Sequence, residues 1–186
     1  MLKLFAGLLA ATLIAAAGPC WAQKVRLATN EGDIVLQLDA QKAPKTVANF
    51  LAYVRAGQYD GTIFHRVIDG FMIQGGGYRP DLSEKPTRAP IALESRNGLS
   101  NVRGSVAMAR TAVPDSATAQ FFINVADNLR LDQPNAADGE GYAVFGRVVQ
   151  GMDVVDRIKA VPTQARGEFE NVPVKPVIIR KATVEK

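Results

Sequence analysis

An Asp-Gly pair between two short apolar runs is the feature that most constrains how this chain can fold. The runs cover residues 63–68 and 71–74, and Asp69-Gly70 joins them. Asp-Gly between two β-type runs is typical of a tight β-hairpin, because its turn needs residues that accept positive φ. Three glycines at 75–77 then allow the chain to turn sharply. The sequence therefore predicts an antiparallel hairpin over residues 63–74.

The side chains of this hairpin predict a binding pocket. Strict alternation along the first run places three side chains on one face: Phe64, Arg66 and Ile68. It places His65 and Val67 on the other face. On the second run Met72 and Gln74 share a face, and the hairpin can bring them near Arg66. A guanidinium, an amide and large apolar side chains together suit an apolar ligand with one polar group to orient.

The rest of the chain is predicted to be mainly β with two helices. Further strands are expected over residues 24–29, 34–38, 104–109, 120–125, 142–149 and 177–184. Apolar side chains at helical spacing predict one helix from Pro44 to Gly57 and another around Met152–Ile158. Residues 78–100 and 163–175 lack either period and are predicted as loops. Taken alone, this pattern fits a sandwich as well as a barrel.

The first 22 residues have the pattern of a cleaved secretory signal peptide. Lys3 precedes an apolar run over residues 4–17, and Cys20 and Ala22 are small residues suited to a cleavage site. A membrane anchor is the alternative, but the run is shorter than the about 20 residues of a span. A lipoprotein site at Cys20 is disfavoured by the preceding Pro19. We expect residues 23–186 to form one domain, exported to the periplasm.

Composition excludes several classes of function. The formal charge of +4 becomes +3 without Lys3, and no run of five Lys or Arg residues suggests nucleic-acid binding. The sole histidine, His65, lies mid-strand, and no Gly-x-Ser-x-Gly motif indicates a hydrolase. After cleavage the chain keeps no cysteine, so a metal site of several His and Cys ligands is not expected. We therefore expect no cofactor, no metal and no nucleic-acid partner.

Four sequence blocks, in order, carry a family resemblance. They are Phe64–Gly77, Gly104–Ala109, Ala119–Asn124 and Tyr142–Val148. Together they resemble the cyclophilin-type peptidyl-prolyl cis-trans isomerases, over nearly the whole chain after residue 23, and the leader suggests a bacterial periplasmic branch. The resemblance implies a closed eight-stranded antiparallel β-barrel capped by two α-helices, with the ligand groove on the outer wall. It also implies a monomer that rotates X-Pro bonds in extended polypeptides and assists the folding of exported proteins.

Isomerisation requires no nucleophile or base, because the barrier of about 18–20 kcal/mol comes from lost amide resonance. A hydrogen-bond donor aimed at the imide nitrogen stabilises the twisted bond, and a guanidinium suits that task. By resemblance, Arg66 is the catalytic residue and Gln74 holds it. The implied substrate contacts are the proline slot (Phe71, Met72, Phe122 and Leu131), Gln120, Ala109, the Arg110 backbone, and the rim residues His65 and Tyr142.

Two residues depart from the family pattern. Arg110 stands where Asn is common, and Arg130 stands where an aromatic residue, often Trp, closes the slot. We expect Arg110 to spare catalysis, and Arg130 to weaken binding of cyclosporin. Two other classes are considered: a catalytically idle module that holds Pro-containing segments as a chaperone, and an envelope structural protein. Arg66 favours the enzyme, since a pure binder has no need of a donor over the imide nitrogen.

Overall fold

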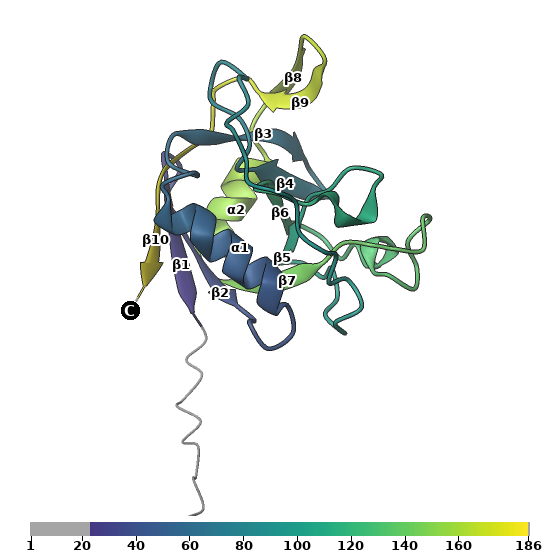
Figure 1. Cartoon of the computed structure of the whole chain (residues 1–186). Helices are drawn as coiled ribbons and strands as arrows, with labels where there is room; N and C mark the ends of the chain where they lie inside the picture. The colour runs from purple at the N-terminus through teal and green to yellow at the C-terminus, as the bar shows by residue number, and fades with distance from the viewer. Residues whose placement is uncertain (1–22, 186) are drawn as a thin grey trace, which may run out of the picture.

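The computed structural model describes residues 23–185, and the predicted signal peptide lies outside them. Eight strands form a closed barrel in which every neighbouring pair is antiparallel (Figure 1). Their order around the wall is β1-β10-β3-β4-β6-β5-β7-β2. The bounds are β1 Lys24–Thr29, β2 Asp33–Leu38, β3 Thr62–Ile68, β4 Met72–Gly75, β5 Ser105–Met108, β6 Phe121–Asn124, β7 Val144–Gln150 and β10 Ile178–Glu185. The predicted closed eight-stranded barrel is confirmed.

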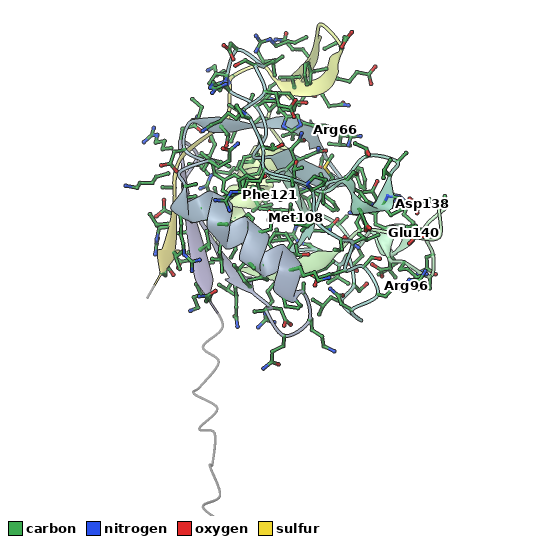
Figure 2. All side chains as sticks on the ribbon, viewed as in Figure 1. Arg66, Arg96, Met108, Phe121, Asp138 and Glu140 are labelled. Atoms are coloured by element: carbon green, nitrogen blue, oxygen red, sulfur yellow. The ribbon has the colours of Figure 1, made fainter. Side chains whose placement is uncertain are left out.

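Two helices cap the barrel, as predicted. They are α1 over Pro44–Arg55 and α2 over Met152–Lys159. Proline suits the first turn of α1, where its missing N–H would have no helical partner. Phe50 of α1 is fully buried, and its ring centroid lies 5.0 Å from Tyr59, 5.5 Å from Phe121 and 5.0 Å from Phe145. Figure 2 shows Phe121 and Met108 in the interior behind α1. The barrel interior is therefore packed with apolar side chains.

A β-bulge in β3 corrects the predicted alternation. Phe64 pairs with Gly75 and Arg66 pairs with Gln74, so His65 has no partner on β4. An unpaired residue shifts the strand by one position, and both faces change at that point. Phe64 is consequently in the inner core with Val67 rather than on the face of Arg66 and Ile68. The predicted grouping of Phe64 with Arg66, and of His65 with Val67, is wrong.

A short hairpin occupies most of the predicted loop 163–175. Strands β8 (Thr163–Arg166) and β9 (Phe169–Pro173) form a separate two-stranded sheet around Gly167. Gly167 has φ +59°, the left-handed conformation that favours glycine. The prediction failed because these strands are polar and largely exposed, and therefore show little apolar alternation. Strand β9 lies against β3, and the hairpin stands at the top of Figure 1.

The other connections are irregular. Residues 79–104 contain no helix or strand, in agreement with the loop predicted for residues 78–100. Isolated bridges such as Tyr78 to Glu84 join them to the rest of the fold. Two short 3₁₀ turns lie at Pro114–Ser116 and Leu129–Leu131. Within residues 23–185 no helix is both long enough and apolar enough to span a bilayer.

Candidate active site

A second apolar cluster lies outside the barrel, on the wall formed by β3, β4, β6, β5 and β7. Its buried members are Met72, Ala107, Phe122 and Val144, and the partly buried residues around them are Ile68, Phe71, Leu99, Ala109, Leu131 and Tyr142. All four predicted slot residues are therefore brought together, and we call this group the outer apolar cluster. Alternation along β6 places Phe121 in the inner core and Phe122 in the outer cluster. Such a cluster on a wall away from the core suits an apolar ligand.

A row of three polar side chains runs from β3 through β4 to the residue that precedes β6, beside the outer apolar cluster. Arg66 Nη1 donates to Gln74 Oε1 at 3.4 Å, and Gln74 Nε2 donates to Gln120 Oε1 at 3.0 Å. Gln120 lies close over the backbone of Gly77, where a Cβ atom would be 2.6 Å from Gln120 Cγ. A side chain at position 77 would therefore displace Gln120 from this place. The row thus places the Arg66 guanidinium beside an apolar surface. One of its nitrogens is bonded to Gln74, the contact that the resemblance implies.

The side chain of Arg110 does more than the sequence predicts. It is only 2% exposed and pairs with Asp138, while Nε donates to the Gly141 carbonyl at 2.8 Å. Its guanidinium lies 4.7 Å from the centroid of the Tyr142 ring, and that ring meets Phe122 edge-on at 5.6 Å. Arg110 thus ties the loop that carries Asp138 to the rim of the outer apolar cluster. Figure 2 shows Asp138 at the outer edge of the molecule.

Asp138 and Gly141 are functional neighbours that sequence reasoning missed. Hydrogen bonds from Arg110, and then from the Glu140 and Gly141 amides, hold the pKa of Asp138 well below its usual range. The carboxylate therefore stays charged at neutral pH. A buried guanidinium needs a carboxylate partner, and this need was the signal that the sequence offered for Asp138. The sequence has 18 acidic residues, so the signal did not identify which of them pairs with Arg110.

Arg130 lies where the resemblance places a closing aromatic residue. Its guanidinium carbon lies 4.7 Å from the centroid of the Phe71 ring, close enough for a cation–π contact. The residue is exposed, whereas Phe71 is half-buried against the outer apolar cluster. Arg130 thus covers Phe71 with a charged head that remains hydrated.

His65 lies on the outer face beside Arg66, at the bulge of β3. It is 5% exposed and meets the Tyr78 ring edge-on at 4.7 Å. Burial, and secondarily the charge of Arg66, lowers the pKa of His65 to about 4. The ring is therefore neutral at pH 7, and its Nδ1 has no hydrogen-bond partner among residues 23–185. A proton-transfer role would require a pKa nearer neutrality, so His65 is not a suitable general acid.

The lowered pKa predicts that stability falls as pH falls from 6.5 to about 4. In this window the unfolded chain binds a proton at His65 and the folded chain does not, so protonation favours unfolding. The loss is at most about 3 kcal/mol, from the size of the shift. Urea denaturation at both ends of the window measures it. His65→Gln should lose less stability than the unmodified protein, and equal losses would contradict the assignment.

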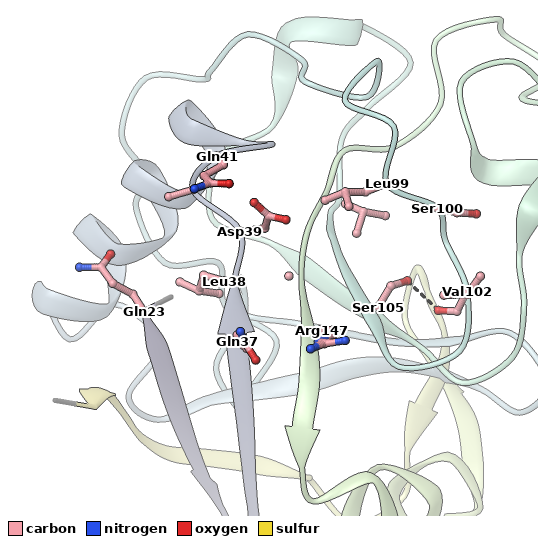
Figure 3. Close-up of a pocket in the computed structure, with 13 residues that line it drawn as sticks. Gln23, Gln37, Leu38, Asp39, Gln41, Leu99, Ser100, Val102, Ser105 and Arg147 are labelled. Carbon is pink, nitrogen blue, oxygen red and sulfur yellow. Dashed lines mark hydrogen bonds between the residues drawn. The ribbon is translucent and has the colours of Figure 1, made fainter. Parts of the chain in front are cut away.

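A larger hollow lies elsewhere on the molecule. It has a volume of about 510 Å³ and is lined by residues of β2, β5, β7 and their flanking loops, among them Gln37, Leu99 and Arg147 (Figure 3). None of the predicted site residues lines it. A smaller hollow of about 390 Å³ contains the row of Arg66, Gln74 and Gln120 and continues to the β8–β9 hairpin. The smaller hollow therefore belongs to the candidate site.

Comparison with known proteins agrees with this fold. The family model of cyclophilin type peptidyl-prolyl cis-trans isomerases matches residues 24–184. The chain therefore belongs to the cyclophilin-type peptidyl-prolyl cis-trans isomerase family, which places it in that enzyme class.

Among its relatives, peptidyl-prolyl cis-trans isomerase cyp18 of Streptomyces antibioticus is 59% identical, over 86% of this chain and 97% of the relative. Peptidyl-prolyl cis-trans isomerase B of Escherichia coli is 57% identical, over 84% of this chain and 96% of the relative. A cyclophilin type isomerase from Cryptosporidium parvum, crystallised in the presence of the dipeptide Ala-Pro, has a TM-score of 0.75 at 29% identity. That match covers 88% of this chain and 99% of the other.

Proposed function

We propose that the chain rotates X-Pro bonds by holding the proline ring on the outer apolar cluster with Arg66 beside the imide nitrogen. The observation that carries this assignment is the row of Arg66, Gln74 and Gln120 next to the predicted slot residues. An apolar ring and one developing polar atom are what this combination can recognise. The Ala-Pro dipeptide used with the Cryptosporidium relative supports a proline-containing ligand.

The chemistry follows from the loss of amide resonance. As the X-Pro bond twists, the imide nitrogen regains its lone pair and becomes a hydrogen-bond acceptor. Arg66 can donate to that atom in the twisted state and not in the planar one, which lowers the barrier selectively. Gln74 accepts from Nη1 of Arg66 and so restricts how the guanidinium turns. No bond to the substrate is made or broken.

The remaining residues position the substrate. Phe71, Met72, Phe122 and Leu131 would contact the pyrrolidine ring. Ala109 and the backbone of Arg110 would contact the residue before proline, and Gln120 would contact the substrate backbone. Tyr142 would form the rim, held there by Arg110. Arg110 is thus a positioning residue in this proposal.

The test is an exchange measurement by NMR on an Ala-Pro peptide with residues 23–186. A catalytic amount of the protein should speed cis/trans exchange. A binding module would instead shift peptide resonances without speeding exchange, and that outcome would favour the chaperone alternative. The presence of Arg66 favours the enzyme over the binding module, because binding alone needs no hydrogen-bond donor at the imide nitrogen.

We infer that the protein acts on exported chains in the periplasm, as a monomer without nucleic acid. The leader pattern over residues 1–22 supports this location. We expect cleavage after Ala22, so that the mature chain begins at Gln23. Intact-mass measurement of periplasmic protein checks it, and Ala22→Phe, with a bulky residue before the cleaved bond, is the control that should stay uncleaved. A membrane fraction that retains residues 1–22 would indicate an anchor.

A further inference from the structure

The hollow beside Arg66 extends past the outer apolar cluster to the β8–β9 hairpin. Its volume is about 390 Å³, and beyond Arg66 it is lined by His65, Tyr78, Glu168, Phe169 and Glu170. The ring of Phe169 meets Tyr78 edge-on at 5.0 Å and lies 6.5 Å from His65, so these aromatic contacts fix the hairpin on β3. We call this part of the hollow the acidic hollow. It combines aromatic walls with two carboxylates.

The two carboxylates form no ion pair with any residue of the described range 23–185. Within residues 23–185 neither Glu168 nor Glu170 has an oxygen within 4.0 Å of a cationic nitrogen. The neighbouring cation on β8, Arg166, donates instead to the Pro80 carbonyl at 3.2 Å. Arg66 is the cation that lines the hollow, and its Nη1 is directed to Gln74. The acidic hollow thus offers unpaired negative charge to a ligand.

The wall of the acidic hollow also has an unused hydrogen-bonding group. His65 is 5% exposed, lines the hollow, and has a ring Nδ1 with no partner in the described chain. Buried polar side chains are usually hydrogen-bonded, so an unpartnered one beside a cavity indicates a ligand that the free chain lacks. This observation is independent of the two carboxylates. The two carboxylates favour a ligand that can donate hydrogen bonds, and His65 adds an unsatisfied polar group to the wall of the same hollow.

The order of the strands indicates which part of a substrate reaches this place. The wall runs β5-β6-β4-β3, and β9 lies against β3. Ala109, which would contact the residue before proline, follows β5, whereas Phe122 and Met72 of the middle strands would contact the ring. A chain that crosses the wall in this direction passes Arg66 on β3 after its proline. The residues that follow proline therefore meet the hairpin.

We propose that the acidic hollow binds the residues that follow proline and selects Lys or Arg within three positions after it, which rests on the proposed function. The methylene stem of Lys or Arg would lie on Phe169 and Tyr78, and its charged head would meet Glu168 and Glu170. The inference specifies a substrate class, namely basic segments directly downstream of proline.

Exchange rates on matched peptides test the proposal. The set is Ala-Ala-Pro followed by three residues, with Lys, Gln or Glu placed in turn at each of those positions. The best Lys peptide should have a kcat/KM about three- to tenfold above its Gln counterpart, from two exposed ion pairs. Glu should be worst. Raising ionic strength from about 0.01 M to about 1 M should remove most of the preference. Lys placed before proline should give no gain.

The double variant Glu168→Gln with Glu170→Gln should lose the preference, so that its rates on the Lys and Gln peptides become equal. Glu31→Gln is the matched control, because Glu31 lies in the β1–β2 turn and does not line the hollow. A preference for Lys that survives in the double variant would overturn the proposal, as would equal rates for Lys and Gln in the unmodified enzyme. Failure to speed any peptide would instead overturn the proposed function, and the subsite with it.

Discussion

Arg66→Ala is expected to lower kcat/KM on an Ala-Pro peptide by about two to three orders of magnitude. Removing a donor that acts on a transition state typically costs about 2.7–4 kcal/mol. The fold should survive, because Arg66 lies on the outer wall and, within residues 23–185, its side chain donates a hydrogen bond to Gln74 alone. Exchange measured by NMR reports the rate, and thermal unfolding of the same sample reports the fold.

Two further variants sharpen this test. Arg66→Lys should recover only part of the rate, because an ammonium lacks the fork that can meet Gln74 and the imide nitrogen together. Arg147→Ala removes an exposed arginine of β7 that lies outside the outer apolar cluster, and should leave the rate unchanged. A well-folded Arg66→Ala protein with a near-normal rate would defeat the mechanism and favour the binding module.

Cyclosporin is expected to inhibit this enzyme poorly, and Arg130→Trp is expected to sensitise it. In the family the aromatic residue at this place covers the slot and offers an indole N–H to the inhibitor. Here the guanidinium of Arg130 lies over Phe71 instead, with a head that stays in water. A buried aromatic anchor is often worth about 2 kcal/mol, or about 30-fold in affinity. Inhibition titrations at equal active-site concentration measure the change.

The control is Arg130→Leu, which removes the charge without adding a ring or a donor and should gain less than Arg130→Trp. Short Pro peptides should be turned over at similar rates by all three proteins, because their ring reaches mainly the contacts of Phe122 and Met72. Nanomolar inhibition of the unmodified enzyme would show that Arg130 does not limit inhibitor binding.

Much of the fold could be predicted from local pattern. The Asp69-Gly70 pair marks a turn by its residue types. The helix that starts at Pro44 and most strands of the barrel are marked by the spacing of their own apolar residues. Barrel closure could not, because it depends on β1 pairing with both β2 and β10, and such long-range pairing leaves no local signal. The family resemblance supplied that step.

The candidate site was predicted in its members more than in its arrangement. The four slot residues of the outer apolar cluster and the pair of Arg66 with Gln74 were expected, since the resemblance names them. The bulge at His65 was not, because strict alternation is the only rule that a short strand offers. Likewise the clamp of Arg110 on Asp138 joins residues far apart in the sequence, so no spacing marks it.

The bulge at His65 also affects how barrels of this family can differ in the length of β3. Phe64 and Val67 both point into the core, and the two residues between them, His65 and Arg66, both face outward. These two residues occupy the place of the single outward residue of a regular strand. A residue gained or lost at this point would leave the inward side chains in place. In a strand without a bulge, the same change would move every later core side chain to the solvent-facing side of the sheet. Evolution can therefore change the number of outward-facing residues beside Arg66 while the core packing stays the same.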